Sequence, residues 1–417
     1  MKRLALLAAV AMLVGCGGGS KPAGDAAELV PPSALAFVSV RSDLGSLPQV
    51  LKRFPFGATA LKAVRQGLQL KPSTGPQLDL AIFKAGTVGF TQPTDEKAFE
   101  AALGPKKLHA QIRGWTVFAD SAPLLDLIKH HKGKLSELPA YKNAIGRLPS
   151  SAVVRAYGAP GAGASVLGAR FGRSIPVGGG TNWTAAALTS SGTELKLEVH
   201  AKGTKGPALQ SSADLVSQIP AGSVLAAGLG GFGPLPESLN LGGIDLKGIA
   251  EALGDQAIVY VRAGLPFPEV TIASKPKDPA KAVRDIGRLI TKLSKTKNAP
   301  LAATLDGVTL HDVALGAVDI YYGTFDGLFV VSDSMDSIAG LRSSGDKLKV
   351  PGLPDKTNGF LYIDVEHALP AVRAFAKLAN QKVPAQVDAN LKPLKTLVLY
   401  GTRDGDVQSI FAVLQVR

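Results

Sequence analysis

Apolar positions recur along this chain with two different periods, and glycine, proline and other turn residues separate the segments. Leu195, Leu197 and Val199 alternate with polar residues, a period of two that predicts a strand with one buried face. In 280–293 apolar residues recur every three or four positions, which predicts an amphipathic helix with Asp278 as its N-cap. Strand pairs joined by short turns, with helices between them, predict an α+β fold whose sheet is largely antiparallel.

The same order of elements occurs twice along the chain. Residues 114–121 and 327–334 both run from a glycine through an apolar strand to an Asp-Ser pair, and an amphipathic helix follows each. An opening strand and a strand pair precede these segments in both halves, and a strand, a helix and a hairpin follow them. The duplication predicts two tandem similar repeats, 29–207 and 208–417, each a largely antiparallel sheet with helices packed on one face.

The first residues have the composition of an export signal. Lys2 and Arg3 precede an apolar run over 4–14, which is too short to cross a bilayer as a mature helix. The sequence Leu-Val-Gly-Cys at 13–16 closes this run and resembles the bacterial lipobox. The resemblance implies that a diacylglyceryl group is attached to the sulfur of Cys16 and that cleavage occurs just before this residue.

A lipidated cysteine sets the expected processing and location of the chain. We predict a lipoprotein signal peptide in 1–15, lipidation at Cys16 and a flexible glycine-rich tether in 16–28. Cys16 is the single cysteine of the chain, so no disulfide competes for it. One acyl chain binds a membrane weakly, whereas two or three hold a protein there stably. The mature protein is therefore expected at the extracytoplasmic face of the cell membrane or the outer membrane.

Composition and charge narrow the expected partners. The chain has 417 residues, enough for large cores, and a formal net charge of +13. An exported protein rarely meets nucleic acid, so we expect none as a partner, and the membrane itself is contacted through the acyl chains on Cys16. Phospholipid head groups and cell-wall polymers are the anionic partners nearest to it. The densest basic cluster, 129–134, fits either a solvated helix end or a polyanion contact.

Known catalytic and cofactor motifs find no support in the sequence, so we predict no catalytic, cofactor-binding or metal site. The glycines of 228–233 match G-x-G-x-x-G, but Pro234 argues against the helix that a dinucleotide site needs. Asp120 and Asp333 recur between the halves, and helix capping explains them better than a pair of catalytic carboxylates. Trp115 and Trp183 fit core positions better than a sugar-stacking surface. None of the histidines has metal-ligand spacing: His109, His130, His131, His200, His311 and His367.

Two further segments carry a family resemblance. The opening Pro-Pro-Ser-Ala-Leu-Ala-Phe-Val at 31–38, its second-half partner, and Glu-Leu-Pro-Ala-Tyr-Lys-Asn-Ala at 137–144 leading into Leu148-Pro149 resemble a bacterial family called domain of unknown function 3352. The resemblance covers most of the mature chain. It implies an extracytoplasmic, often membrane-attached protein with no assigned reaction, and it transfers no functional residue.

Together these patterns predict a lipid-anchored extracytoplasmic envelope lipoprotein with a non-enzymatic binding or scaffolding role. Three alternatives stay open: a lipid or lipoprotein carrier, a transporter-associated solute-binding lipoprotein, and an envelope hydrolase.

Overall fold

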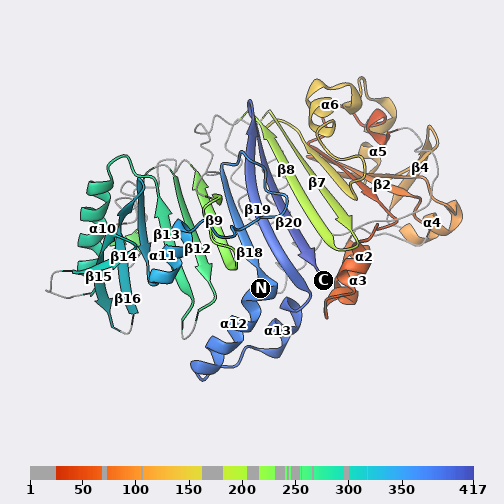
Figure 1. Cartoon of the computed structure of the whole chain (residues 1–417). Coiled ribbons are helices and arrows are strands. Elements are labelled where there is room, and N and C mark those ends of the chain that lie inside the picture. Colours follow the sequence, from red (N-terminus) through yellow and green to blue (C-terminus); the bar gives the residue numbers. More distant parts are fainter. Residues whose placement is uncertain are drawn as a thin grey trace. The chain divides into compact units, whose positions relative to one another are not determined.

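Contacts within the computed structural model divide the chain into two units (Figure 1). The first unit comprises Met1–Lys205 and Asp404–Arg417, and the second comprises Gly206–Arg403. The division falls close to the predicted boundary between 207 and 208, but the last residues of the chain join the first unit. The structure describes residues 25–67, 73–104, 107–161, 182–203, 216–230, 240–241, 244–245, 254, 256–264, 267–294, 300–316 and 318–417.

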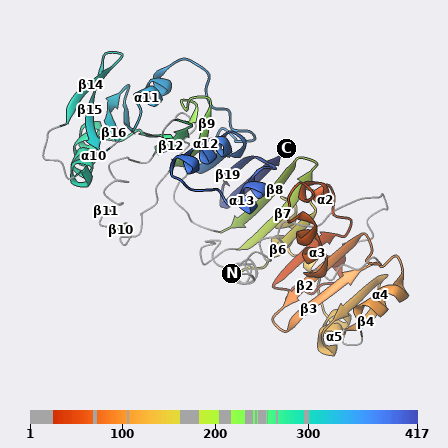
Figure 2. The same cartoon turned by 90° about the horizontal axis from the view of Figure 1, so that it is seen from below.

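The first unit is an α+β structure built on one antiparallel sheet. Its strands pair in the order β4-β5-β3-β2-β1-β6-β7-β8-β20, and Figure 2 shows several of them side by side. The strands are β1 (Ala36–Arg41), β2 (Gln77–Phe83), β3 (Gly86–Thr91), β4 (Leu108–Ile112), β5 (Trp115–Ala119), β6 (Val154–Gly158), β7 (Trp183–Ser191), β8 (Glu194–Lys202) and β20 (Val407–Val416). The helices are η1 (Ala26–Glu28), α2 (Leu47–Leu51), α3 (Gly57–Gly67), α4 (Glu96–Leu103), α5 (Ala122–His130), η2 (Leu135–Glu137) and α6 (Pro139–Ile145).

Helices cover both faces of this sheet. On one face Phe90 lies in a core with Leu124 of α5 and Tyr141 of α6. On the opposite face Leu78 packs against Phe99 of α4. The prediction of helices on one face is therefore wrong for this unit. The reason lies in strands such as β2, which carries apolar side chains on both of its sides, so that both faces need a cover.

The second unit is likewise an α+β structure with an antiparallel sheet. Its strands pair in the order β14-β15-β16-β17-β13-β12-β9-β18-β19. The strands are β9 (Ser223–Gly230), β12 (Gln256–Arg262), β13 (Glu269–Ser274), β14 (Leu301–Leu305), β15 (Val308–Leu315), β16 (Val318–Phe325), β17 (Leu328–Ser332), β18 (Gly359–Asp364) and β19 (Leu394–Asp404), with a separate pair β10 (Asn240–Leu241) and β11 (Ile244–Asp245). The helices are α10 (Pro279–Ser294), α11 (Met335–Arg342), α12 (Val365–Leu378) and α13 (Ala385–Leu391).

Here too the helices pack on both faces, which corrects the one-face prediction for the second unit as well. Ile286 of α10 shares a core with Phe329 of β17. On the other face the hydroxyl of Tyr260 donates a 2.7 Å hydrogen bond to the carbonyl oxygen of Ser337 in α11. The helix predicted at 280–293 is confirmed. Its cap is also as predicted, because a carboxylate oxygen of Asp278 accepts a hydrogen bond from the backbone N–H of Lys281.

Candidate functional site

The residues singled out in the sequence are dispersed over the structure. Cys16 and the whole of 1–24 lie outside the described residues. Of the glycine-rich motif, 228–230 lies inside strand β9, where no phosphate-binding turn is formed, and 231–233 is not described. Trp115 and Trp183 are core residues, as predicted. Within the part of the chain that is described, no group of three or more His, Cys, Asp or Glu side chains is placed to hold a metal ion.

The recurring Asp-Ser pairs serve different purposes from the one predicted. The N-cap residues of α5 and α11 are Ser121 and Ser334, whereas Asp120 and Asp333 precede them. Asp120 forms an ion pair with Lys107, and Asp333 accepts a hydrogen bond from the backbone N–H of Val270. The prediction that Asp120 and Asp333 cap these helices is therefore wrong. One step further along the chain, the side chain of Ser334 accepts a hydrogen bond from the backbone N–H of Ser337, whereas the side chain of Ser121 forms no capping hydrogen bond.

The basic cluster 129–134 ends α5 and is largely exposed, with Lys129 and His130 in the last helical turn. His131 differs from its neighbours. Its Nε2 lies 2.9 Å from the carbonyl oxygen of Leu29, and its Nδ1 lies 2.7 Å from that of Gly133. This histidine thus fastens the end of α5 to the segment that follows η1. It serves packing within the first unit.

A buried carboxyl lies at the centre of the first sheet. Asp79 on β2 is fully buried, and Nε2 of Gln77 lies 2.8 Å from both of its carboxylate oxygens. In register beside it are Ser39 of β1 and then Arg155 of β6. Burial raises the pKa of Asp79 to about 7, although hydrogen bonds from Ser39 and Gln77 and the charge of Arg155 work in the opposite direction. Asp25, which lies close enough to raise the same pKa, accepts a 3.4 Å hydrogen bond from Tyr141.

A second polar cluster joins β8 to β20. Nδ1 of His200 lies 2.7 Å from Oγ of Ser409, and its Nε2 lies 4.0 Å from Oε1 of Glu198. Burial alone would raise the pKa of Glu198, but contacts from His200 and Lys196 outweigh it, so the pKa is lowered. Serine, histidine and glutamate are the residue types of an acyl-transfer triad. All three side chains are nearly enclosed, however, and the 4.0 Å separation is too long for the hydrogen bond that would orient the ring. The cluster therefore lacks the access and alignment that a nucleophilic serine needs.

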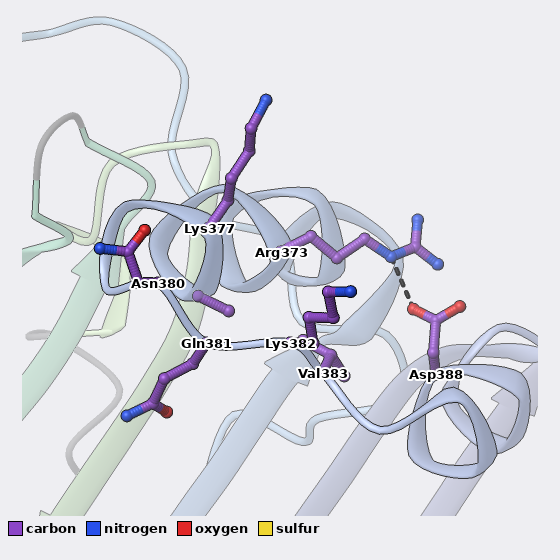
Figure 3. A pocket seen from close by; sticks show the side chains of 8 residues that line it. Arg373, Lys377, Asn380, Gln381, Lys382, Val383 and Asp388 are labelled. Carbon is purple, nitrogen blue, oxygen red and sulfur yellow. Dashed lines mark hydrogen bonds and ion pairs between the residues drawn. The ribbon is translucent and has the colours of Figure 1, made fainter.

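The remaining candidate site is on the helical pair α12–α13, which lies beyond the ends of β18 and β19 (Figure 1). The side chain of Asp364 caps α12, and Leu369 is the buried residue of this helix. Nε of Arg373 lies 2.6 Å from a carboxylate oxygen of Asp388 on α13, and this hydrogen bond lowers the pKa of Asp388. Figure 3 shows this contact between the helices, with Lys377 extending away from it.

A shallow pocket of about 530 Å³ opens between α12 and α13. Most of its lining residues are polar or charged, but the larger part of the surface that they turn towards the pocket is apolar. The lining residues are Arg373, Ala376, Lys377, Asn380, Gln381, Lys382, Val383 and Asp388 (Figure 3). A shallow pocket with this mixed lining suits an amphipathic partner rather than an enclosed apolar ligand. We call Arg373, Lys377 and Lys382 the basic side of the helical pair.

Large apolar side chains are exposed on the same helical pair. Val372, Phe375 and Leu378 of α12 are 51%, 45% and 61% exposed. Their spacing of three residues places them along one side of the helix. Phe267, 45% exposed on the connection between β12 and β13, has its ring centroid 6.1 Å from that of Phe375. We call these four residues the α12 stripe. Sequence reasoning predicted a helix here but missed the site, because the amphipathic pattern of 365–378 does not tell which side is left uncovered.

Comparisons with known proteins assign no family to the chain. No family model and no curated protein matches it. Among solved structures, crystal form I of TP0453 aligns with a TM-score of 0.27 at 13% identity over 45% of this chain and 82% of that one. Crystal form III of TP0453 aligns with a TM-score of 0.28 at 13% identity over 48% and 88%. Likenesses this weak support no functional assignment. Among the described helices, none has the length and apolar character to cross a membrane.

Proposed function

We propose that this chain is a lipid-anchored extracytoplasmic envelope lipoprotein that acts by binding or scaffolding and not by catalysis. The observation that carries the proposal is Leu-Val-Gly-Cys at 13–16, directly after a short apolar run. The packed body begins soon afterwards, because Ala26 and Ala27 are fully buried in the first unit. The link from Cys16 to Asp25 spans at most about 32 Å, so an acylated Cys16 would hold the body close to the bilayer.

A binding role agrees with how polar and apolar groups are distributed. The buried polar clusters at Asp79 and at His200 are enclosed within the sheet of the first unit. Exposed side chains of mixed chemistry gather instead on α12–α13. The pocket there is shallow and open, whereas a lipid carrier needs an enclosed apolar cavity. The antiparallel sheets differ from the parallel, alternating lobes of solute-binding proteins.

The two units are, in this proposal, copies of one repeat. The order β5-β3-β2-β1-β6-β7 in the first unit corresponds, strand by strand along the chain, to β17-β13-β12-β9-β18-β19 in the second. Helix α4 and its counterpart α10 precede the outer strands, and α5 and its counterpart α11 follow them. In each unit the members of this pair pack on opposite faces of the sheet. We extend the proposal to membership of the domain of unknown function 3352 family, which rests on the repeated openings before β1 and β9.

The proposal is tested by lipid labelling in the native host. Wild-type chain should incorporate radioactive palmitate and sediment with membranes. Cys16→Ala should lose the label, and it should either leave the membrane fraction or keep an uncleaved signal. Ser20→Ala, a change of similar size four residues away, should behave as wild type. A Cys16→Ala chain that still takes up palmitate, or an unlabelled wild-type chain, would overturn the proposal.

A further inference from the structure

The α12 stripe and the basic side of the same helical pair are suited to one class of partner. We infer that α12–α13 docks on the surface of an anionic lipid bilayer, as a membrane contact separate from the acyl chains. The inference rests on the proposed function in one respect, since a protein held at the envelope is the one that meets such a surface. It adds to that proposal the surface of the second unit that contacts the membrane, and the requirement that the lipids be anionic.

The apolar part of the surface has no cover in the described protein. Leu369 near the start of α12 is buried, whereas Val372, Phe375 and Leu378 become exposed as the helix continues. Phe375 and Phe267 extend the same surface onto a second segment. Leaving such side chains in water is unfavourable, and they mark a site of association. The stripe follows a convex helix rather than a groove, which fits insertion among lipid chains.

The charged part of the surface has the sign that anionic lipids attract. Between Val365 and Lys395 there are five lysine or arginine residues and two acidic residues, a net charge of +3. Within the described part of the chain, neither Lys377 nor Lys382 forms an ion pair, while Arg373 is held by Asp388. Arg373 and Lys377 are four residues apart and share one side of α12. Each basic group near an anionic bilayer adds about 1 kcal/mol of attraction, equivalent to about fivefold in binding.

The dimensions of α12 favour a helix that lies on the membrane. Its 14 residues are about 21 Å long, shorter than the hydrocarbon core of about 30 Å. An amphipathic helix of this kind places its apolar residues at the boundary between head groups and acyl chains, and its lysines reach the phosphates. A cell-wall polymer would satisfy the lysines but would leave the stripe exposed to water.

Vesicle binding without the acyl anchor tests the inference. The protein is the chain from residue 16 onward with Cys16→Ala, which keeps every described residue and lacks both signal and lipid. We expect it to sediment with phosphatidylcholine vesicles that contain phosphatidylglycerol, to bind pure phosphatidylcholine weakly, and to be released by salt. The double variant Phe375→Ser/Leu378→Ser should weaken binding at least about tenfold, since it removes two inserted side chains. Lys377→Glu/Lys382→Glu should weaken it by at least as much.

Matched changes elsewhere in the second unit serve as controls. Leu301→Ser removes a side chain that is 71% exposed on β14, at the opposite end of the strand order of the second unit from β18 and β19. Lys356→Glu reverses an exposed charge in the loop that precedes β18, whereas α12 follows that strand. Both controls should bind as the parent does, and far-ultraviolet circular dichroism should show that all variants are folded.

Three results would overturn the inference. The first is equal binding to vesicles with and without phosphatidylglycerol. The second is vesicle binding by the two double variants that is as strong as that of the controls. The third is retention on purified teichoic acid that depends on Lys377 and Lys382 but not on Phe375 and Leu378, which would assign the surface to a polymer. None of these results affects palmitate labelling of the wild-type chain, so failure here and failure of the proposed anchor are separate outcomes.

Discussion

Replacing the buried carboxyl of Asp79 should change how the stability of the first unit depends on pH. Asp79 is fully buried, and burial raises its pKa from 3.8 to about 7 in the folded protein. The folded state therefore prefers the protonated carboxyl. This contribution to stability is fully present below about pH 4 and is lost as the pH rises to about 7. Asp79→Asn puts a neutral group of the same shape in its place and removes the titration.

The magnitude follows from the size of the shift. A rise of about three pKa units at 1.36 kcal/mol per unit corresponds to about 4 kcal/mol. We treat this as an upper value, since Arg155 and the hydrogen bonds from Ser39 and Gln77 also respond to the charge. The free energy of unfolding of Asp79→Asn minus that of wild type should thus increase by up to about 4 kcal/mol between pH 4 and pH 7. Relative to wild type, the variant should therefore be more stable at pH 7 than at pH 4.

Tryptophan fluorescence is the appropriate assay, because the two tryptophans of the chain, Trp115 and Trp183, are both buried in the first unit. Urea unfolding at a series of pH values gives the free-energy difference at each. Asp126→Asn, which neutralises an exposed carboxyl on α5, is the matched control and should give a flat difference. A flat difference for Asp79→Asn as well, or one that decreases with pH, would refute the reasoning about this carboxyl.

Two further predictions concern packing and capping. A Cβ at Gly89 would lie 2.2 Å from the ring of Phe118, so Gly89→Ala should lower stability by about 1–3 kcal/mol in the same fluorescence assay. Gly192→Ala, where the nearest atom is 3.8 Å away, should change it little, and equal losses would contradict the packing argument. The hydroxyl of Ser334 accepts a hydrogen bond from the backbone N–H of Ser337, so Ser334→Ala should cost about 1 kcal/mol in urea unfolding followed by circular dichroism. At Ser121, where no such bond forms, the same change should cost less, and a larger loss there would contradict the capping argument.

Elements defined by neighbours in sequence were predictable. Helix α10 extends over Pro279–Ser294, within one residue of the prediction at each end, because its apolar stripe and its Asp278 cap are local features. The α+β class followed from the same kind of local pattern. Neither depends on which distant segments come together.

Features that depend on distant segments were not predictable. The alternation in β8 predicted Leu197 and Val199 on the buried side, yet Glu198 and His200 are the more buried residues. They are covered by Ser409 and Phe411 of β20, which lie two hundred residues later in the chain. On α12 the difference has the opposite sign, because apolar residues there are more exposed than their pattern predicts. The pattern of this helix predicts a buried face, but the described part of the second unit leaves the apolar residues of that face exposed.

The strand β20 has a consequence for how the protein is made. The chain leaves the first unit after Lys205 and returns to it at Asp404, so the second unit is inserted between β8 and its partner strand. During synthesis the chain emerges with its N-terminus first. Until the final residues have emerged, β8 presents an unpaired edge of the kind that recruits other strands. The sheet of the first unit is therefore completed only after the last residues of the chain have emerged, and a protein shortened at its C-terminus would leave the β8 edge open to aggregation.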